Sequence, residues 1–353
     1  MDPAKKDHPA AIYLIGTGNV GKAFLSMLDP GRHVLHGVTN SRKMLLDTEG
    51  IRPAAAAEAV EEKGIQADLS RFLEKMEGDP SRNRICVDCS AGTGVALRHA
   101  DILSAGISLV TANKLAVAGK YAYYRSLMRL CEKKHVHYAY ETTVGAALPV
   151  ISTLRRLRSA GDPVRRIEAV PSGTLSYCFN RLSEGRSFSS VVRDARDKGY
   201  TEPDPRQDLQ GMDAARKAII MARESGEKCE MEDAVPPRII SRSALHAESM
   251  DSFFKQLRKE DPSWEERVRR LRENEKKLRY MTVIEKGKID IRLAETGSGH
   301  PFYNLSGTEN IFAFYTRQFS RYPLIIRGEG AGGALTASGV LADVEAVMEN
   351  LSQ

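Results

Sequence analysis

The sequence lacks several features that would place it in a specialised class of protein. It has five cysteines and one tryptophan in 353 residues, and its single Cys-x-x-Cys, Cys86-Val-Asp-Cys89, stands in a strand-like apolar run. This usage argues against a disulfide scaffold or a zinc site and favours a reducing compartment. We recognise neither a signal peptide nor an apolar run of membrane-spanning length. We therefore expect a cytoplasmic protein that does not act at a membrane.

A large excess of one charge is also missing. Lys and Arg number 52 against 46 Asp and Glu, which gives a net charge of +6. The densest basic run, residues 255–279, is interleaved with acids, as is typical of a solvated helix and not of a nucleic-acid surface. We therefore expect no nucleic-acid partner, and the length allows two domains with cores of their own.

A glycine-rich turn near the start of the chain is the first positive signal. The apolar run 11–15 leads into a Gly-x-Gly-x-x-Gly sequence, and a helical pattern follows over 22–28. In this context the motif predicts dinucleotide binding, with a tight turn at the first glycine, close approach of the pyrophosphate at the second and close helix packing at the third. A glycine turn that binds nothing is the alternative. The predicted cofactor-binding residues are Gly16, Thr17, Gly18, Asn19, Val20 and Gly21.

The end of the second predicted strand, 33–38, bears on cofactor choice. NAD-preferring sites usually place an acid there for the ribose 2′-hydroxyl. This sequence reads Thr-Asn-Ser and then Arg42 and Lys43, two cations within reach of a 2′-phosphate. We therefore predict a preference for NADP(H), with NAD(H) also possible. The alternative is that the two cations only solvate the start of a helix.

Two further strands of the same sheet are predicted at 84–89 and 107–111. Ser90 follows the first and Lys114 closely follows the second. Ligands of open α/β sheets lie beyond the carboxyl ends of the strands. Ser90 is therefore expected at the cofactor and Lys114 near the nicotinamide, although Lys114 can equally be a solvated loop cation.

A strand predicted at 136–141 ends in the carboxylate of Glu141. A turn of small residues follows over 142–149 and opens a helix over 149–160. Such a turn leaves carbonyl oxygens free to coordinate a cation, although alone it is a weak signal.

The segment 199–217 combines a stiff acidic loop with a helix. Two prolines exclude helix from the loop, which carries Glu202. Asp213 and Lys217 then lie four residues apart, so their side chains share one helix face. These three groups could hold a small zwitterion and move a proton. An ordinary surface salt bridge is the alternative for the Asp213–Lys217 pair.

Several of these segments, taken in order, resemble the homoserine dehydrogenases over nearly the whole chain. The resemblance is closest to the dehydrogenase portion of fused aspartate kinase–homoserine dehydrogenases. The usual Pro before Asn-Lys is replaced by Ala112, and Gln207 replaces a frequent Asp. The segments that carry the resemblance are the N-terminal glycine motif, 87–90, 111–114, 141–149, 171–177, 199–217 and 327–337.

The resemblance implies reversible NAD(P)H-dependent reduction of L-aspartate 4-semialdehyde to L-homoserine, in the biosynthesis of threonine, methionine and isoleucine. It implies an acid/base role for Lys217 assisted by Lys114, and a homodimer. Further residues implied at the sites are Glu202, Asp213, Gly173 and Tyr200 for substrate, Ser90 and Gly332 for cofactor, and Glu141 with the backbone of Val144, Ala146 and Leu148 for a monovalent cation, Na⁺ or K⁺.

The fold class that we predict is α/β, with a Rossmann-type domain over 1–148 completed by a C-terminal helix within 332–353. A second, α+β domain over 149–331 would bind substrate, carry the catalytic residues, dimerise and contain a mixed or largely antiparallel sheet. Met1–Pro9 is expected to be disordered. Many relatives continue into a C-terminal ligand-sensing domain, and we expect no threonine feedback through such a domain here.

Two other functions remain open at this stage. A dehydrogenase of the aspartate-semialdehyde type would need a thiolate with a histidine base, and no cysteine here has an evident histidine partner. A non-catalytic redox sensor would keep the glycine turn but would not need the three groups Glu202, Asp213 and Lys217 together.

Overall fold

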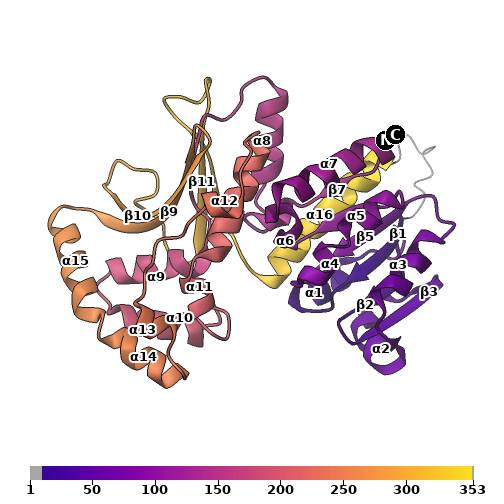
Figure 1. The fold of residues 1–353 in the computed structure, drawn as a ribbon, viewed down its shortest axis with the longest axis horizontal. Coiled ribbons are helices and arrows are strands. Elements are labelled where there is room, and N and C mark those ends of the chain that lie inside the picture. Colours follow the sequence, from indigo (N-terminus) through magenta and orange to yellow (C-terminus); the bar gives the residue numbers. More distant parts are fainter. Residues whose placement is uncertain (1–9, 352–353) are drawn as a thin grey trace. The chain divides into compact units, whose positions relative to one another are not determined.

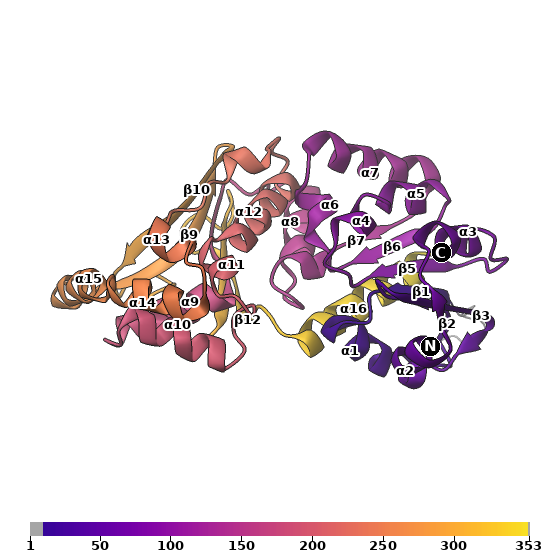
Figure 2. The ribbon, with the colours of Figure 1, turned by 60° about the horizontal axis from the view of Figure 1, so that its bottom comes forward.

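The computed structural model describes residues 10–351 and divides the chain into two compact units. The first unit contains the residues up to 147 and those from 332 onward, and the second contains 148–331. The expectation for Met1–Pro9 lies outside the described residues. Each unit consists of a sheet with helices packed on it (Figures 1 and 2). Within residues 10–351, no helix is long and apolar enough to cross a membrane.

The sheet of the first unit has the order β4-β3-β2-β1-β5-β6-β7. The five strands from β2 to β7 in that order are parallel, and β3 and β4 extend the sheet antiparallel beyond β2. The fold class predicted from the sequence is therefore confirmed for this unit. The strands are β1 (Ala10–Ile15), β2 (His33–Thr39), β3 (Lys43–Ile51), β4 (Ile65–Gln66), β5 (Arg84–Asp88), β6 (Ser108–Thr111) and β7 (Tyr138–Ala139).

Helices cover both faces of this sheet, with α1, α2 and α16 on one side and α5 and α7 on the other (Figure 2). The C-terminal helix α16 packs along α1, and its buried apolar residues, including Val340 and Val344, join one core with Phe24 of α1. The helices are α1 (Asn19–Met27), α2 (Ala56–Lys63), α3 (Leu69–Glu77), α4 (Thr93–Ala96), α5 (His99–Ser104), α6 (Lys114–Ala118), α7 (Tyr121–Lys134) and α16 (Gly333–Leu351), with 3-10 turns η1 (Pro53–Ala55) and η2 (Glu141–Thr143).

One sequence expectation for this unit was wrong, and one alternative is not what the structure shows. The strand predicted at 136–141 is only two residues long, because β7 pairs with β6 alone and the chain turns into η2 at Glu141. Arg42 and Lys43 do not open a helix, which was the alternative for these two cations: Arg42 lies in the bend after β2, and Lys43 begins β3, which returns antiparallel to β2. Strand β3 escaped prediction because its outer half, Asp47–Gly50, is polar and largely exposed.

The second unit is built on a five-stranded sheet of order β10-β9-β8-β11-β12, in which every pairing is antiparallel. The prediction of a mixed or largely antiparallel sheet thus resolves to a fully antiparallel one among the described residues. The strands are β8 (Arg166–Val170), β9 (Lys277–Glu285), β10 (Lys288–Thr296), β11 (Glu309–Tyr315) and β12 (Leu324–Glu329).

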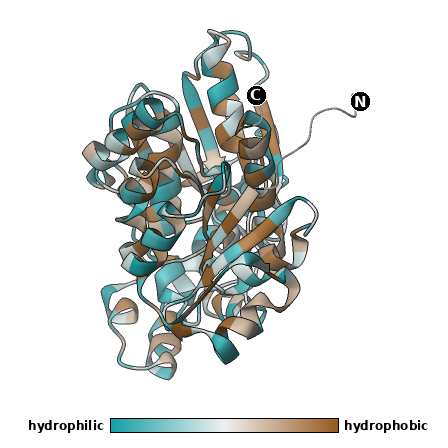
Figure 3. Ribbon diagram, turned by 90° about the vertical axis from the view of Figure 1, so that its right-hand side faces the viewer, coloured by the Kyte–Doolittle hydropathy of each residue, from teal (hydrophilic) through white to brown (hydrophobic). Residues whose placement is uncertain are grey.

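Helices α9 and α12 pack directly against this sheet. Aromatic side chains hold the layers together: the ring of Phe179 on α9 lies 6.3 Å from that of Tyr280 on β9 and 6.0 Å from that of Trp264 on α15. Figure 3, in which the right-hand side of Figure 1 faces the viewer, shows hydrophobic and hydrophilic residues alternating along both helices and strands. The helices are α8 (Val150–Ser159), α9 (Gly173–Ser183), α10 (Phe188–Asp197), α11 (Arg206–Leu209), α12 (Met212–Glu224), α13 (Arg242–Leu245), α14 (Met250–Arg258) and α15 (Asp261–Glu273), with a 3-10 turn η3 (Met231–Asp233).

Candidate active site

The glycine turn of the first unit has the geometry that a bound pyrophosphate requires. Gly16 has φ of +101°, which side-chain-bearing residues rarely adopt. A Cβ on Gly21 would lie 1.9 Å from the carbonyl oxygen of Gly16, so only glycine permits this packing of α1 on β1. No atom lies within 4 Å of where a Cβ on Gly18 would sit. The turn is therefore closely packed at Gly16 and Gly21 and open at Gly18. Helix α1 begins directly after Gly18, so its free N–H groups can bind a phosphate there.

The C-terminal helix returns to the same turn. A Cβ on Gly333 would lie 3.3 Å from the Cβ of Asn19, and the preceding Gly332 has φ of +129°. The start of α16 is therefore packed against the first residue of α1. Gly332, predicted at the cofactor from resemblance alone, lies beside the glycine turn although more than 300 residues separate them.

Ser90 and Lys114 lie at the carboxyl ends of β5 and β6, and Asn113 connects them. The side-chain amide of Asn113 donates to the carbonyl of Gly92 at 3.0 Å and to the hydroxyl of Ser90 at 3.4 Å. Its side-chain oxygen accepts from the N–H of Leu115 and so caps α6, whose first residue is Lys114. The backbone of Lys114 is therefore held at the start of a helix and does not lie in a loop, whereas the role of its ammonium stays a prediction.

Asn113 is not among the site residues predicted from the sequence. Asn directly before a helical run is a recognisable N-cap signal, so this position could have been found. The hydrogen bonds from Asn113 to Gly92 and Ser90 could not have been predicted, because they join the ends of two different strands.

A buried polar network supports this edge of the sheet. Asp88, at the end of β5, accepts from the backbone N–H of Ser90 at 2.8 Å. Its other oxygen lies 2.9 Å from Nε2 of His99, and Nδ1 of His99 lies 2.9 Å from the hydroxyl of Tyr138. Asp88 and His99 are fully buried, so this bonding satisfies polar groups that would otherwise be costly in the core.

The turn expected to hold a cation is unusual in its backbone. Gly145 and Ala146 have φ of +82° and +53° in succession, and Val144 and Ala146 are buried. Helix α16 packs closely against this turn, since a Cβ on Gly339 would lie 2.6 Å from Cγ2 of Thr142. The change of backbone direction aims successive carbonyls differently, and oxygen ligands suit a hard monovalent cation. Glu141 lies at the start of the turn, in the first unit, and Leu148 is the first residue of the second unit.

In the second unit, Lys217 is buried within a defined set of acceptors. Its ammonium lies 2.7 Å from Oδ2 of Asp213 and donates to the carbonyl of Pro171 at 2.7 Å. The Lys217 side chain is 7% exposed, whereas Lys198, which makes the same four-residue pairing with Asp194, is 45% exposed. The surface salt bridge of the alternative reading therefore describes Lys198 and not Lys217, since a buried ammonium must be held by acceptors.

The acidic loop reaches the same region through Asp208, which the sequence analysis missed. Asp208 accepts from the backbone N–H of Glu202 at 2.9 Å and from the hydroxyl of Thr174 at 3.2 Å. Burial raises the pKa of Asp208, and the carboxylates of Glu202 and Asp213 raise it further. Three carboxylates are therefore near one another here. No pattern in the sequence distinguishes Asp208 from Asp204, which instead pairs with Arg206.

Gly173 and Tyr200 complete this group. Gly173 is the first residue of α9, and a Cβ there would lie 3.2 Å from the carbonyl of Thr308. The carbonyl of Tyr200 accepts from Thr174, and its exposed ring lies 5.0 Å from that of Tyr177. The start of α9, the acidic loop and one face of α12 thus bring together the substrate-side residues that the sequence predicted within this unit.

The environments of Cys86, Cys89 and Cys178 are poorly suited to a nucleophilic thiolate. All five are free thiols, and burial raises the pKa of Cys178 to about 12. Burial also raises the pKa of Cys86 and Cys89, with Asp88 adding to the shift. Thiols in this state are unreactive near neutral pH. The thiolate chemistry of the aspartate-semialdehyde type is therefore disfavoured.

A glycine turn shaped for a dinucleotide and a buried lysine among carboxylates, on one chain, are features of a nicotinamide-dependent oxidoreductase. Comparison with known proteins gives the particular family. Residues 149–344 match the family model described as homoserine dehydrogenase, and residues 16–141 match the one described as the homoserine dehydrogenase NAD-binding domain. The chain belongs to the homoserine dehydrogenase family.

Individual relatives agree with this assignment. A homoserine dehydrogenase of Emericella nidulans is 35% identical, over 97% of this chain and 100% of the relative. The chloroplastic bifunctional aspartokinase/homoserine dehydrogenase 2 of Arabidopsis thaliana is 40% identical over 95% of this chain. The chain spans only 38% of the length of that relative, as it does for several other bifunctional ones.

Solved structures show the same fold. A Candida auris protein of unknown function has a TM-score of 0.89 and 30% identity, covering 97% of this chain and 99% of its own. A hyperthermophilic archaeal homoserine dehydrogenase in complex with NADPH has a TM-score of 0.73 at 23% identity, covering 96% of this chain and 98% of its own. The second likeness bears on the fold alone.

Proposed function

We propose that this protein catalyses the reversible NAD(P)H-dependent reduction of L-aspartate 4-semialdehyde to L-homoserine. The observation that carries the proposal is the placement of Lys217, whose buried ammonium is held by Asp213 and the carbonyl of Pro171. Family membership supports the substrate, and the open glycine turn supports the dinucleotide. We further propose that the first unit binds the cofactor and that the second binds the substrate and forms a homodimer.

A bound nicotinamide cofactor would supply or accept the hydride. The charge that develops on the substrate oxygen needs a donor, and the ammonium of Lys217 can stabilise it and then give up a proton. Asp213, at 2.7 Å, orients that ammonium. Glu202 is exposed on the acidic loop and is suited to the ammonium of the substrate. Lys114 has the assisting role that the family resemblance implies.

The cofactor and cation assignments follow the same reasoning. The glycine turn would hold the pyrophosphate, with Ser90 and Gly332 at its margins, and Arg42 and Lys43 would favour NADP(H) over NAD(H). The oxygens of Glu141, Val144, Ala146 and Leu148 are the donor type that Na⁺ or K⁺ takes. That cation would stabilise the turn and take no part in the proton transfer.

The test is homoserine oxidation followed at 340 nm with NADP⁺ and with NAD⁺, in the wild type and in Lys217→Ala. We expect kcat to fall by about two to four orders of magnitude in the variant, since a general acid/base contributes about that much. Cofactor affinity, measured by calorimetry, should be retained. The control is Arg269→Ala, which breaks an exposed pair on α15 and should leave turnover unchanged.

Absence of homoserine-dependent turnover in the wild type, with tight cofactor binding, would favour the redox-sensor alternative. Turnover that survives in Lys217→Ala would keep the activity but remove the acid/base assignment.

A further inference from the structure

Helix α2 brings an acidic residue, Glu61, close to the end of strand β2, although the sequence has no acid directly after that strand. The carboxylate of Glu61 accepts from the side-chain amide of Asn40 at 2.9 Å and from the guanidinium of Arg42 at 3.0 Å. The backbone carbonyl of Glu61 accepts from the ammonium of Lys43. Asn40 directly follows β2, where an NAD-preferring site usually places its acid. Asn40 therefore occupies the usual position of the acid, and the folded chain places the carboxylate of Glu61 beside it.

Asn40 ties this acid to the glycine turn. Its side-chain amide also reaches the hydroxyl of Thr17 at 3.4 Å, and its side-chain oxygen accepts from the N–H groups of Arg42 and Lys43, each at 2.8 Å. Asn40 thus orients the backbone of Arg42 and Lys43. It also contacts Glu61 and, through Thr17, the glycine turn. Glu61 lies where the adenosine ribose of a dinucleotide is expected in this fold.

The charge of Glu61 is maintained by its partners. The hydrogen bond from Arg42 lowers its pKa, which burial alone would raise, and Asn40 and Lys43 lower it further. The carboxylate is therefore ionised at neutral pH and competes with a 2′-phosphate for the guanidinium of Arg42. It can also accept a hydrogen bond from a 2′-hydroxyl, as the usual acid does.

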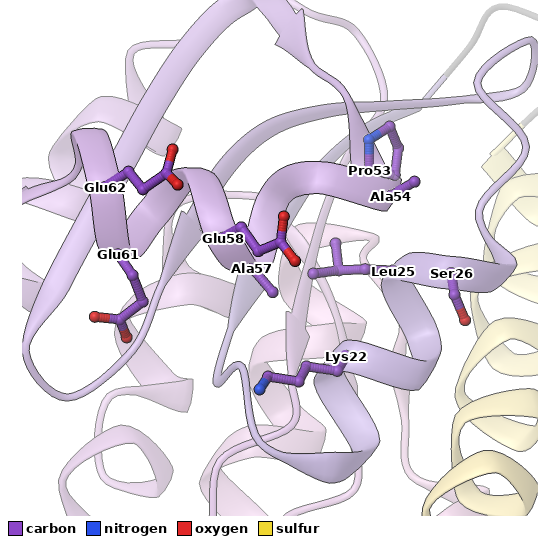
Figure 4. Close-up of a pocket in the computed structure, with 9 residues that line it drawn as sticks. All are labelled: Lys22, Leu25, Ser26, Pro53, Ala54, Ala57, Glu58, Glu61 and Glu62. Atoms are coloured by element: carbon purple, nitrogen blue, oxygen red, sulfur yellow. The ribbon is translucent and has the colours of Figure 1, made fainter.

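The ion pair between Arg42 and Glu61 is exposed and is therefore weak. The side chains of Arg42 and Glu61 are 76% and 43% exposed, and solvent screens a pair of this kind, so a competing anion can displace the carboxylate. Glu61 also lines a pocket between α1 and α2, to which Lys22, Glu58 and Glu62 contribute (Figure 4). A carboxylate displaced from Arg42 therefore has open space beside it, lined by one cation, Lys22, and by two further acids, Glu58 and Glu62.

We propose that Glu61 is a specificity-determining residue, which opposes the 2′-phosphate of NADP and accepts the 2′-hydroxyl of NAD, so that both cofactors are used. This inference rests on the proposed dehydrogenase function. It refines the prediction of NADP preference: Arg42 and Lys43 favour the phosphate, and Glu61 limits the preference they create.

The test measures the dissociation constants of NADP⁺ and NAD⁺ in the wild type, Glu61→Gln and Glu61→Ala. We expect the ratio of the two constants to move toward NADP by about fivefold in both variants, the equivalent of one exposed charge interaction. Adenosine 2′,5′-bisphosphate should gain affinity by a similar factor, whereas adenosine 5′-monophosphate should not. Glu62→Gln removes the same charge one residue along α2 and should leave the ratio unchanged.

The inference is overturned if the ratio in both Glu61 variants stays within about twofold of the wild type. It is also overturned if they lose NADP affinity as Arg42→Ala is expected to, since Glu61 would then only order Arg42. A wild-type protein that binds neither cofactor would refute the proposed function itself. A wild type active with homoserine, with unchanged specificity in the Glu61 variants, would refute this inference alone.

Discussion

The carboxylate of Asp343 on the final helix accepts a hydrogen bond at 3.0 Å from the backbone N–H of Glu141, 202 residues earlier in the chain. The same helix lies so close to the turn that a Cβ on Gly339 would contact Ala147 at 3.1 Å. Helix α16 is thus a structural part of the turn that we propose to hold a cation, and it completes the first unit.

This contact predicts the behaviour of Asp343 variants. Asp343→Ala should lower the free energy of unfolding by about 1 kcal/mol, because the partly buried N–H of Glu141 loses its acceptor. Asp343→Asn should recover most of that loss, since its amide oxygen can still accept. Denaturant unfolding measures both, with Glu349→Ala, an exposed acid on the same helix, as the control. An Asn variant as unstable as the Ala variant would show that the negative charge, and not the hydrogen bond, is what matters.

The glycine turn predicts two different outcomes for similar substitutions. Gly21→Ala should impair folding, because its Cβ would lie 1.9 Å from the carbonyl oxygen of Gly16. Gly18→Ala should fold normally, because its Cβ would meet no atom within 4 Å and φ is −74°. It should nevertheless weaken dinucleotide binding by an order of magnitude or more, since the methyl group would occupy the space for the pyrophosphate. Thermal unfolding and cofactor titration separate the two effects, and tight binding by Gly18→Ala would contradict the proposed site.

Asp208 is predicted to position the loop that carries Glu202. Asp208→Ala should raise the KM for homoserine about tenfold and change kcat less, because the loop loses two hydrogen bonds while Lys217 keeps its acceptors. Asp208→Asn should give an intermediate KM. Steady-state kinetics provide the measurement, with Asp197→Ala, an exposed acid at the end of α10, as the control. A fall in kcat at constant KM would instead indicate a direct part in the chemistry.

The lowered pKa of Glu168 leads us to expect that the free energy of unfolding depends on pH. Burial alone would raise its pKa, but hydrogen bonds with His300 and Arg166 outweigh burial and lower the pKa from 4.5 to about 2. Because the pKa in the folded state lies below that in the unfolded chain, its stabilisation is fully present above pH 4.5. It is lost as the pH falls toward 2, and its upper limit is about 3 kcal/mol.

The measurement compares the free energy of unfolding of the wild type and Glu168→Gln between pH 7 and pH 3. The wild type should lose stability more steeply below pH 4.5 than the variant. Glu285→Gln, which removes an exposed carboxylate near Arg166, should follow the wild type. Parallel curves for the wild type and Glu168→Gln would contradict the prediction.

The local patterns of the chain were sufficient for its most regular features. An apolar run followed by glycines and a helical period located β1, the turn and α1, because each is fixed by neighbouring residues. The spacing of Asp213 and Lys217 likewise predicted their pairing, since residues four apart on a helix are neighbours. The predicted fold class and family are confirmed, whereas the roles of the individual site residues stay predictions.

Tertiary structure decided which local possibilities became part of a site. Lys198 and Lys217 have the same pairing in the sequence, and only the packing of α12 buries one of them. The acid beside Arg42 comes from α2, about 20 residues further along, and the acceptor for Glu141 comes from the end of the chain. A sequence pattern reports contacts between residues a few positions apart. The packing of whole helices and sheets decides which distant groups form an ion pair or a hydrogen bond.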